Sequence, residues 1–170
     1  GKEDIEDIVC KATIHNRASK EASIWVMPTI WFRKTWFTGD EPFMPTLRKS
    51  SKNKIKAFSP NSGNYSFIFH GEPELKFCDN ETNRERLYHI GNQKKYLKDA
   101  INDYVLHGDT VHLNPKNTGT KSAAIYKLTI PAGGKSEVLF RMQKLQTENP
   151  IKNAESILQN RIDDTNKFYE

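Results

Sequence analysis

The chain has 170 residues, which suits one ordinary domain with its own core and is too short for two large ones. No apolar run approaches the roughly 18 residues of a membrane span, and 11% aromatic residues argue against a disordered chain. The net charge of +5 comes from Met44–Phe58, which holds five cations and no acidic residue, so a face-wide nucleic-acid surface is not indicated.

Alternation of apolar and polar residues predicts β-strands from the start of the chain. Ile8–Ile14 alternates as a half-buried strand does. The next run is apolar on both faces, with Ala22, Ile24, Val26, Ile30 and Phe32 on one side and Trp25, Met27 and Trp31 on the other. Burial of both faces is typical of a central strand, so Trp25 and Trp31 are predicted to lie in the core. Pro28 predicts a bulge or an edge, because it cannot donate a ladder hydrogen bond.

Further strands are expected at 54–58, 65–69 and 74–78, where turn-forming sequences separate three alternating runs. Ser122–Ile130 and Glu137–Met142 alternate on either side of a turn sequence rich in proline and glycine, which predicts a β-hairpin. Strands at this spacing favour an antiparallel sandwich over repeated β-α-β units.

Two helices interrupt the strands. Apolar residues recur at helical spacing between Lys94 and Leu106. Near the end, Asn149 is a suitable N-cap and Pro150 a suitable first residue for an amphipathic helix that reaches Glu170. That helix has no C-terminal stop signal, so the natural polypeptide is expected to continue beyond it.

The expected fold class is mainly β: an antiparallel, supersandwich-like β-sandwich with one internal helix and a C-terminal helix. Residues 1–146 would form the sandwich as part of a larger N-terminal region, and residues 147–170 would form the helix that leads toward a further domain. Cys10 and Cys78 both fall in expected strands, which favours buried free thiols over a disulfide.

Motifs for nucleotide, metal or nucleophilic chemistry are incomplete. Gly134–Ser136 and Gly119–Ser122 resemble the end of a phosphate-binding loop, but each lacks the required earlier glycine and lies beside strands. The five histidines show no ligand spacing, and no Gly-x-Ser-x-Gly elbow is present. The sequence therefore indicates no cofactor, no metal and no catalytic residue.

The densest polar cluster is Cys78–Arg86. Its carboxylates, amides and guanidinium groups could bind sugar hydroxyls, and Glu81 with Glu85 could form a pair of glycosidase carboxylates. The alternative is a solvated loop that opens a helix or a strand. Trp36 follows the apolar strand and is the ring most expected to be exposed for stacking on a flat partner.

Several short blocks occur in one order along the chain. They are Asn16-Arg17, Met27–Trp36, Asn80–Asn83, Tyr96–Ala100, Asn114-Pro115 with Gly119–Lys121, and Pro131–Gly134. From about Glu6 to Tyr169, this order resembles the large microbial and fungal glycosidase-like proteins related to glycoside hydrolase family 63 and to mannosylglycerate hydrolase.

The resemblance implies a module of a longer glycosidase. Proteins of this family carry a β-rich sandwich region before an (α/α)6 barrel, and in related enzymes the barrel supplies the general acid and base. This chain would be a non-catalytic part of the β-rich region that docks on the absent barrel and shapes its sugar cleft. The residues expected to contact the barrel or the sugar are Arg33, Trp36, Asn80, Glu81, Asn83 and Arg84.

Two other functions stay open. A stand-alone carbohydrate-binding module would stack Trp36 and a neighbouring ring on a sugar. A nucleic-acid-binding domain would use the basic loop at 48–56, and its binding would weaken steeply with salt. The expected partners are the barrel of the same polypeptide and an oligosaccharide, with nucleic acid disfavoured and no membrane contact. The cytoplasm is the favoured compartment.

Overall fold

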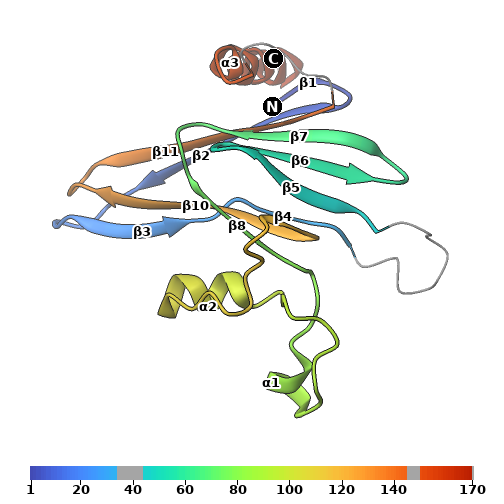
Figure 1. Ribbon diagram of the computed structural model, residues 1–170. Coiled ribbons are helices and arrows are strands. Elements are labelled where there is room, and N and C mark those ends of the chain that lie inside the picture. The colour runs from blue at the N-terminus through green and yellow to red at the C-terminus, as the bar shows by residue number, and fades with distance from the viewer. Residues whose placement is uncertain (34–43, 145–149, 170) are drawn as a thin grey trace.

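The computed structural model describes residues 1–33, 44–144 and 150–169. Two antiparallel sheets pack face to face, with helix α3 above the larger sheet and helices α1 and α2 below the smaller one (Figure 1). The predicted antiparallel β-sandwich is therefore confirmed. None of the helices in these three ranges is long and apolar enough to cross a membrane.

The larger sheet has seven strands. In spatial order they are β1 (Lys2–Asp4), β2 (Asp7–His15), β11 (Lys135–Gln143), β7 (Gly63–Phe69), β6 (Lys54–Ser59), β5 (Thr46–Ser51) and β9 (Thr118–Gly119). The predicted strands at 54–58 and 65–69 are confirmed as β6 and β7. The prediction of a basic loop at 48–56 is wrong. This segment forms most of the β5–β6 hairpin, and Lys52 and Asn53 form its turn.

The smaller sheet is built around one long strand, β10 (Lys121–Ile130). On one side β10 pairs with β8 (Glu74–Cys78), and on the other with β3 (Ala22–Val26) and then β4 (Thr29–Trp31). Pro28 lies between β3 and β4, where its carbonyl accepts a hydrogen bond of 3.0 Å from the amide of Ala124. The predicted interruption at Pro28 is confirmed.

The predicted hairpin of residues 122–130 with 137–142 is wrong. Both strands exist, but β10 belongs to the smaller sheet and β11 pairs with β2 and β7 in the larger one. The turn at Pro131, closed by a 3.0 Å hydrogen bond from the amide of Gly134, carries the chain from one sheet to the other. In both strands, apolar residues that face the core alternate with polar residues that face outward. This pattern is the same for two strands of one hairpin and for two strands in opposite sheets of a sandwich, so it could not distinguish them.

The main core fills the space between the sheets. Its buried side chains come from both layers: Leu47, Ile55, Ala57 and Phe69 from the larger sheet, and Leu75, Phe77 and Ala124 from the smaller. Each large aliphatic or aromatic side chain buried here contributes about 1.5–3 kcal/mol of hydrophobic free energy. Both cysteines are free thiols; Cys78 is buried, as predicted, and Cys10 is only half-buried.

Helix α2 covers part of the smaller sheet and α3 part of the larger, whereas α1 lies away from both sheets (Figure 1). Helix α2 (Ala100–His107) begins within the predicted range and ends one residue beyond it, and Ile101 packs with Ala123 and Ile125 of the smaller sheet. Helix α1 (Arg84–Tyr88) is a second internal helix, where only one was expected.

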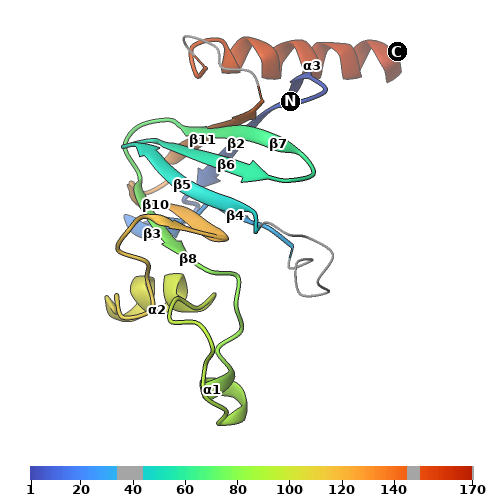
Figure 2. The same cartoon turned by 45° about the vertical axis from the view of Figure 1, so that its right-hand side comes forward.

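Helix α3 (Ala154–Tyr169) starts later than predicted. Pro150 lies in a turn before the helix, and Asn149 lies outside the described residues. The carbonyl of Pro150 accepts a 2.8 Å hydrogen bond from Arg141, which holds this turn against β11. Figure 2 shows α3 lying over the larger sheet and extending past it.

Candidate functional site

Two tryptophans lie on the outer face of the smaller sheet. In the strand register, Trp25 is opposite Lys127 and Trp31 is opposite Lys121. Lys121 and Lys127 share the face of β10 that carries Ala123, on which α2 packs. The predicted separation of this run into an aliphatic side and a tryptophan side is therefore confirmed.

The predicted burial of Trp25 and Trp31 is wrong. Their exposed fractions are 40% and 58%. The physical reason is position: β3 and β4 form the edge of the smaller sheet, while α2 packs over β8 and β10. In the part of the chain that the structure describes, no segment lies over β3 and β4. We call this exposed surface, defined by Trp25 and Trp31, the tryptophan face.

The two rings of the tryptophan face are well separated. Their partners on β10 are six positions apart, which corresponds to about 20 Å at the usual rise of a strand. The ammonium group of Lys127 lies 5.3 Å from the centre of the Trp25 ring, a cation–π geometry. The rings can therefore form two separate contacts with one flat partner.

A groove of about 290 Å³ opens beside β4, between the two sheets. Ile30 and Phe32 line it from the smaller sheet, and Tyr65, Phe67 and Met142 line it from the larger. Trp31 is also among its lining residues, so the groove opens next to the tryptophan face.

Asn80 bonds to the residue that precedes Arg33, just after the end of β4. The side-chain amide of Asn80 donates to the carbonyl of Phe32 at 3.0 Å, and its backbone amide donates to Thr120 Oγ1 at 2.8 Å. Asn80, which follows β8, therefore joins the residue after β4 to the residue before β10. Arg33 follows Phe32 and is exposed, whereas Trp36 lies outside the described residues.

Asn83 is the N-cap of α1, and Arg84 is the first residue of this helix. Asn83 is buried and caps this helix, since its Oδ1 accepts from the amide of Arg86 at 3.1 Å. Arg84 is exposed, and Glu81 is half-buried with its carbonyl accepting from the amide of Lys98 at 2.9 Å. The polar cluster at 78–86 thus contains a loop that opens a helix, which is the alternative that the sequence left open.

Ion pairs of Arg86 with Asp99 and Asp103, which the sequence did not reveal, hold α1 in place. Arg86 donates to Asp99 at 2.7 Å and grips both carboxylate oxygens of Asp103 at 3.1 and 2.8 Å. The hydrogen bond from Arg86 lowers the pKa of Asp103. Since α1 buries none of its own residues, these polar contacts keep it folded. The available signal was the spacing of two aspartates one helical turn apart.

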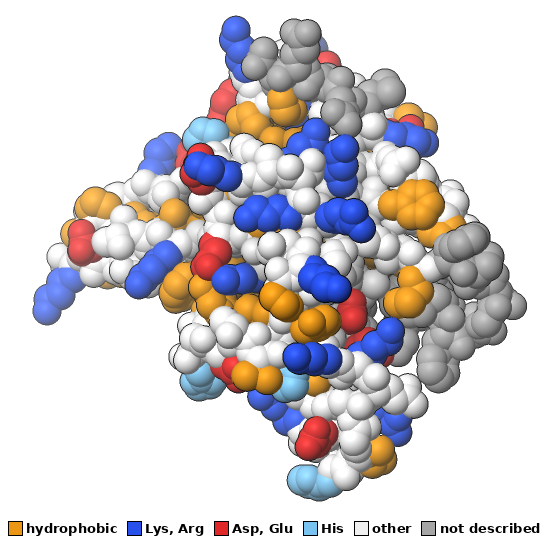
Figure 3. Space-filling model, viewed as in Figure 1, with side chains coloured by type: hydrophobic (Ala, Val, Ile, Leu, Met, Phe, Trp, Pro, Cys, Tyr) orange, Lys and Arg blue, Asp and Glu red, His pale blue; other side chains and the backbone are white. Residues whose placement is uncertain are grey.

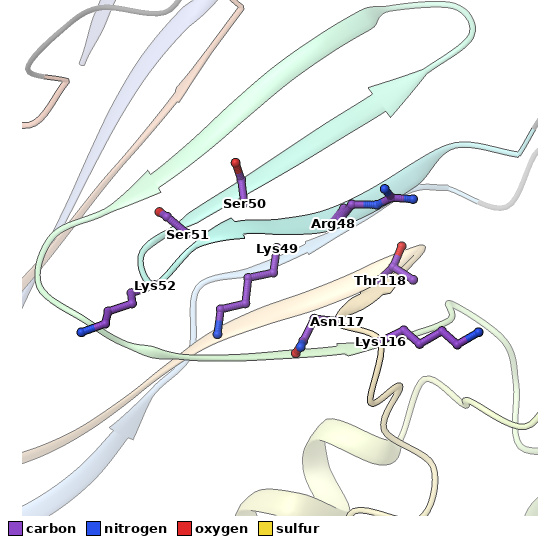
Figure 4. A pocket seen from close by; sticks show the side chains of 8 residues that line it. All are labelled: Arg48, Lys49, Ser50, Ser51, Lys52, Lys116, Asn117 and Thr118. Carbon is purple, nitrogen blue, oxygen red and sulfur yellow. The ribbon is translucent and has the colours of Figure 1, made fainter.

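The basic segment presents its cations to different sides. Arg48 is opposite Lys56 in the β5–β6 register and opposite Thr118 in the β5–β9 register. In Figure 4, Arg48 and Lys116 extend toward one side with Thr118 between them, whereas Lys52 extends the other way. Lys and Arg side chains gather near the middle of the surface in Figure 3.

Comparison with known proteins gives one informative similarity. The chain is 28% identical over 206 residues to "Uncharacterized protein YMR196W" of Saccharomyces cerevisiae, in a match that covers 98% of this chain. The chain spans only 19% of the length of that yeast protein. No family model matches the chain.

Proposed function

We propose that this chain is a non-catalytic β-sandwich module of a longer carbohydrate-active hydrolase. It docks through the tryptophan face on the rest of that polypeptide, an (α/α)6 catalytic barrel, and shapes one wall of the sugar cleft. The observation that carries the proposal is the exposure of Trp25 and Trp31 on one uncovered sheet face. Tryptophan is among the residues most enriched at interface hot spots, and an apolar edge strand left open invites association.

Two further observations support a neighbouring domain. The yeast relative has about four-fifths of its length outside the matched region, room enough for a catalytic domain. Covering the exposed part of each ring, roughly 100 Å², would contribute on the order of 2–3 kcal/mol of hydrophobic free energy. The order of sequence blocks gives the chemical class of the proposed hydrolase.

The test compares the isolated chain with the complete product of its coding sequence, each with and without Trp25→Ser plus Trp31→Ser. The proposal predicts a lower thermal midpoint for the substituted complete product and little change in the isolated chain, where both rings already face water. Tyr88→Ser, at a ring 61% exposed on α1, is the matched control. An equal effect in both contexts, or no effect in either, would contradict docking through this face.

A stand-alone carbohydrate-binding module is the second candidate, because two exposed tryptophans on one face could stack on separate sugars of one chain. Calorimetry of the isolated chain with gluco- and manno-oligosaccharides separates the two. The docking module predicts no heat of binding, whereas the binding module predicts an affinity that Trp31→Ser removes. Both predict that the isolated chain hydrolyses no nitrophenyl glycoside, and turnover above a mock preparation would refute both.

A further inference from the structure

We infer that a second surface, on the open half of the larger sheet, binds an acidic polysaccharide. Helix α3 packs over β2 and β11 on the outer side of this sheet, and no described segment packs over β5, β6 and β9. We call this open half the cationic face and define it by Arg48, Lys56 and Lys116. The expectation of a glycan, as opposed to another polyanion, rests on the proposed function.

The charges on the cationic face repel each other. Arg48 and Lys56 are direct cross-strand partners, and like charges in that position are destabilising. Residues 44–71 contain no aspartate or glutamate, nor do residues 116–122. Among the residues that the structure describes, no acidic side chain pairs with Arg48, Lys56 or Lys116. The fold thus carries a repulsion that a bound anion would relieve.

Other lysines nearby have acidic partners. Lys52 pairs with Glu72 at 3.3 Å, and Lys144 pairs with Glu6 at 2.7 Å. Arg48 and Lys56 on β5 and β6, with Lys116 just before β9, therefore differ from these two lysines in having no acidic partner among the described residues.

Two hollows flank these three cations. One, of about 610 Å³, is lined by Arg48 and Lys116 together with Ser50 and Thr118. The side chains of Arg48 and Lys116 reach toward the same side in Figure 4. The other hollow, of about 330 Å³, lies beside Lys56 and is lined by Asn64 and Ser66 as well as Lys144. Both hollows thus combine cations with neutral hydrogen-bonding side chains.

This combination fits an acidic glycan better than a nucleic acid. A guanidinium group can bind carboxylate or sulfate through two parallel hydrogen bonds, and hydroxyl or amide groups can bind the sugar hydroxyls. Single-stranded nucleic acids are held by several aromatic rings that stack on successive bases. Phe58, 43% exposed, is the one exposed aromatic side chain that the described strand registers place on this face.

The test measures binding of the chain to dextran sulfate and to polygalacturonate, with neutral dextran and poly(U) as comparisons. Arg48→Gln plus Lys56→Gln should weaken binding of the acidic glycans by about tenfold and reduce the salt slope by roughly 1–2. The matched control is Arg17→Gln plus Lys20→Gln, which removes one exposed arginine and one exposed lysine from the β2–β3 loop. It should change the affinity less than about twofold.

Folding is checked in the same samples. Relief of the cross-strand repulsion should raise the thermal midpoint of the Arg48→Gln plus Lys56→Gln variant by roughly 1–3 °C. Binding of dextran sulfate alone would show that sulfate is the recognised group. Binding of polygalacturonate alone would show that carboxylate is the recognised group. Either result supports the inference. Absence of binding to both, equal loss in the control, or tighter binding of poly(U) would overturn it. None of these results depends on Trp25 or Trp31, so docking through the tryptophan face stands or falls separately.

Discussion

Arg141 holds the end of the sandwich together from a buried position. Its side chain is 2% exposed, and its Nε donates to Asp7 at 2.7 Å. Nη1 donates to the carbonyl of Pro150 at 2.8 Å and to Asn153 at 2.9 Å. One guanidinium group therefore joins β2, β11 and the turn before α3.

Arg141→Met should lower the free energy of unfolding by about 3–5 kcal/mol, because it leaves the Asp7 carboxylate without its charge partner. Arg161→Met is the control, since Arg161 pairs with Asp164 at 2.9 Å on the surface and that pair contributes less than about 1 kcal/mol. Urea denaturation measures both. Equal effects of the two substitutions would mean that the Arg141 pair is not a structural link.

Cys78 links stability to alkaline pH. Burial raises the pKa of its thiol from 9.0 to about 12. Between these values the unfolded chain loses the thiol proton while the folded chain keeps it, so stability falls as pH rises. Between about pH 8 and pH 10, wild type should lose about 1 kcal/mol more stability than Cys78→Ala does. Denaturant unfolding at the two pH values checks this, and parallel losses would show that the thiol ionises equally well in both states.

At the scale of elements, α3 is half docked. Ala154 and Ile157 are buried against Val9 and Leu139, whereas Ile162 is 53% exposed further along the same stripe. The apolar periodicity in the sequence predicted the stripe, but it could not show where the sheet beneath the helix ends.

Two substitutions of the same residue type in α3 separate these halves. Ile157→Ala should cost about 2–4 kcal/mol of folding free energy, and Ile162→Ala less than about 1 kcal/mol. Thermal or urea unfolding of the isolated chain measures the difference. Similar costs would mean that the second half of the helix is also packed.

The strands show what alternation can and cannot predict. It assigned Trp25 and Trp31 to one side of their strands correctly, because side chains alternate whatever lies opposite. It predicted wrongly that both rings are buried, because burial depends on whether the strand lies at the centre or at the edge of its sheet. Likewise, β10 and β11 have the local pattern of a hairpin, and only long-range pairing places them in different sheets.

At the candidate site too, the local sequence predicted the kind of side chain but not its contacts with distant residues. Asn83 carries a side chain that suits both sugar binding and helix capping, and its partners Arg86 and Asn92 show that it caps α1. The ion pair of Arg86 with Asp103 joins α1 to α2, and the sequence alone does not show that these two helices lie close together. The residue types thus predicted a cluster of hydrogen-bonding side chains in this region. They could not predict which of these side chains already bond to other residues of the protein.

Across the whole molecule, two surfaces of opposite character lie on the outer sides of the two sheets. The tryptophan face presents two exposed indole rings beside Lys121 and Lys127, and it suits a contact with a protein neighbour. The cationic face is polar and hollowed, and it suits a hydrated anionic ligand. A module that docks through one sheet would keep the other sheet open to solvent.

Hydroxyl-radical footprinting can test docking through the tryptophan face, because it reports the accessibility of each ring. Oxidation of Trp25 and Trp31 is measured in the isolated chain and in the complete product of its coding sequence, each normalised to exposed Tyr88. If the chain docks through this face, both tryptophans react in the isolated chain and are protected several-fold in the complete product. Equal oxidation in the two samples would contradict docking through the tryptophan face.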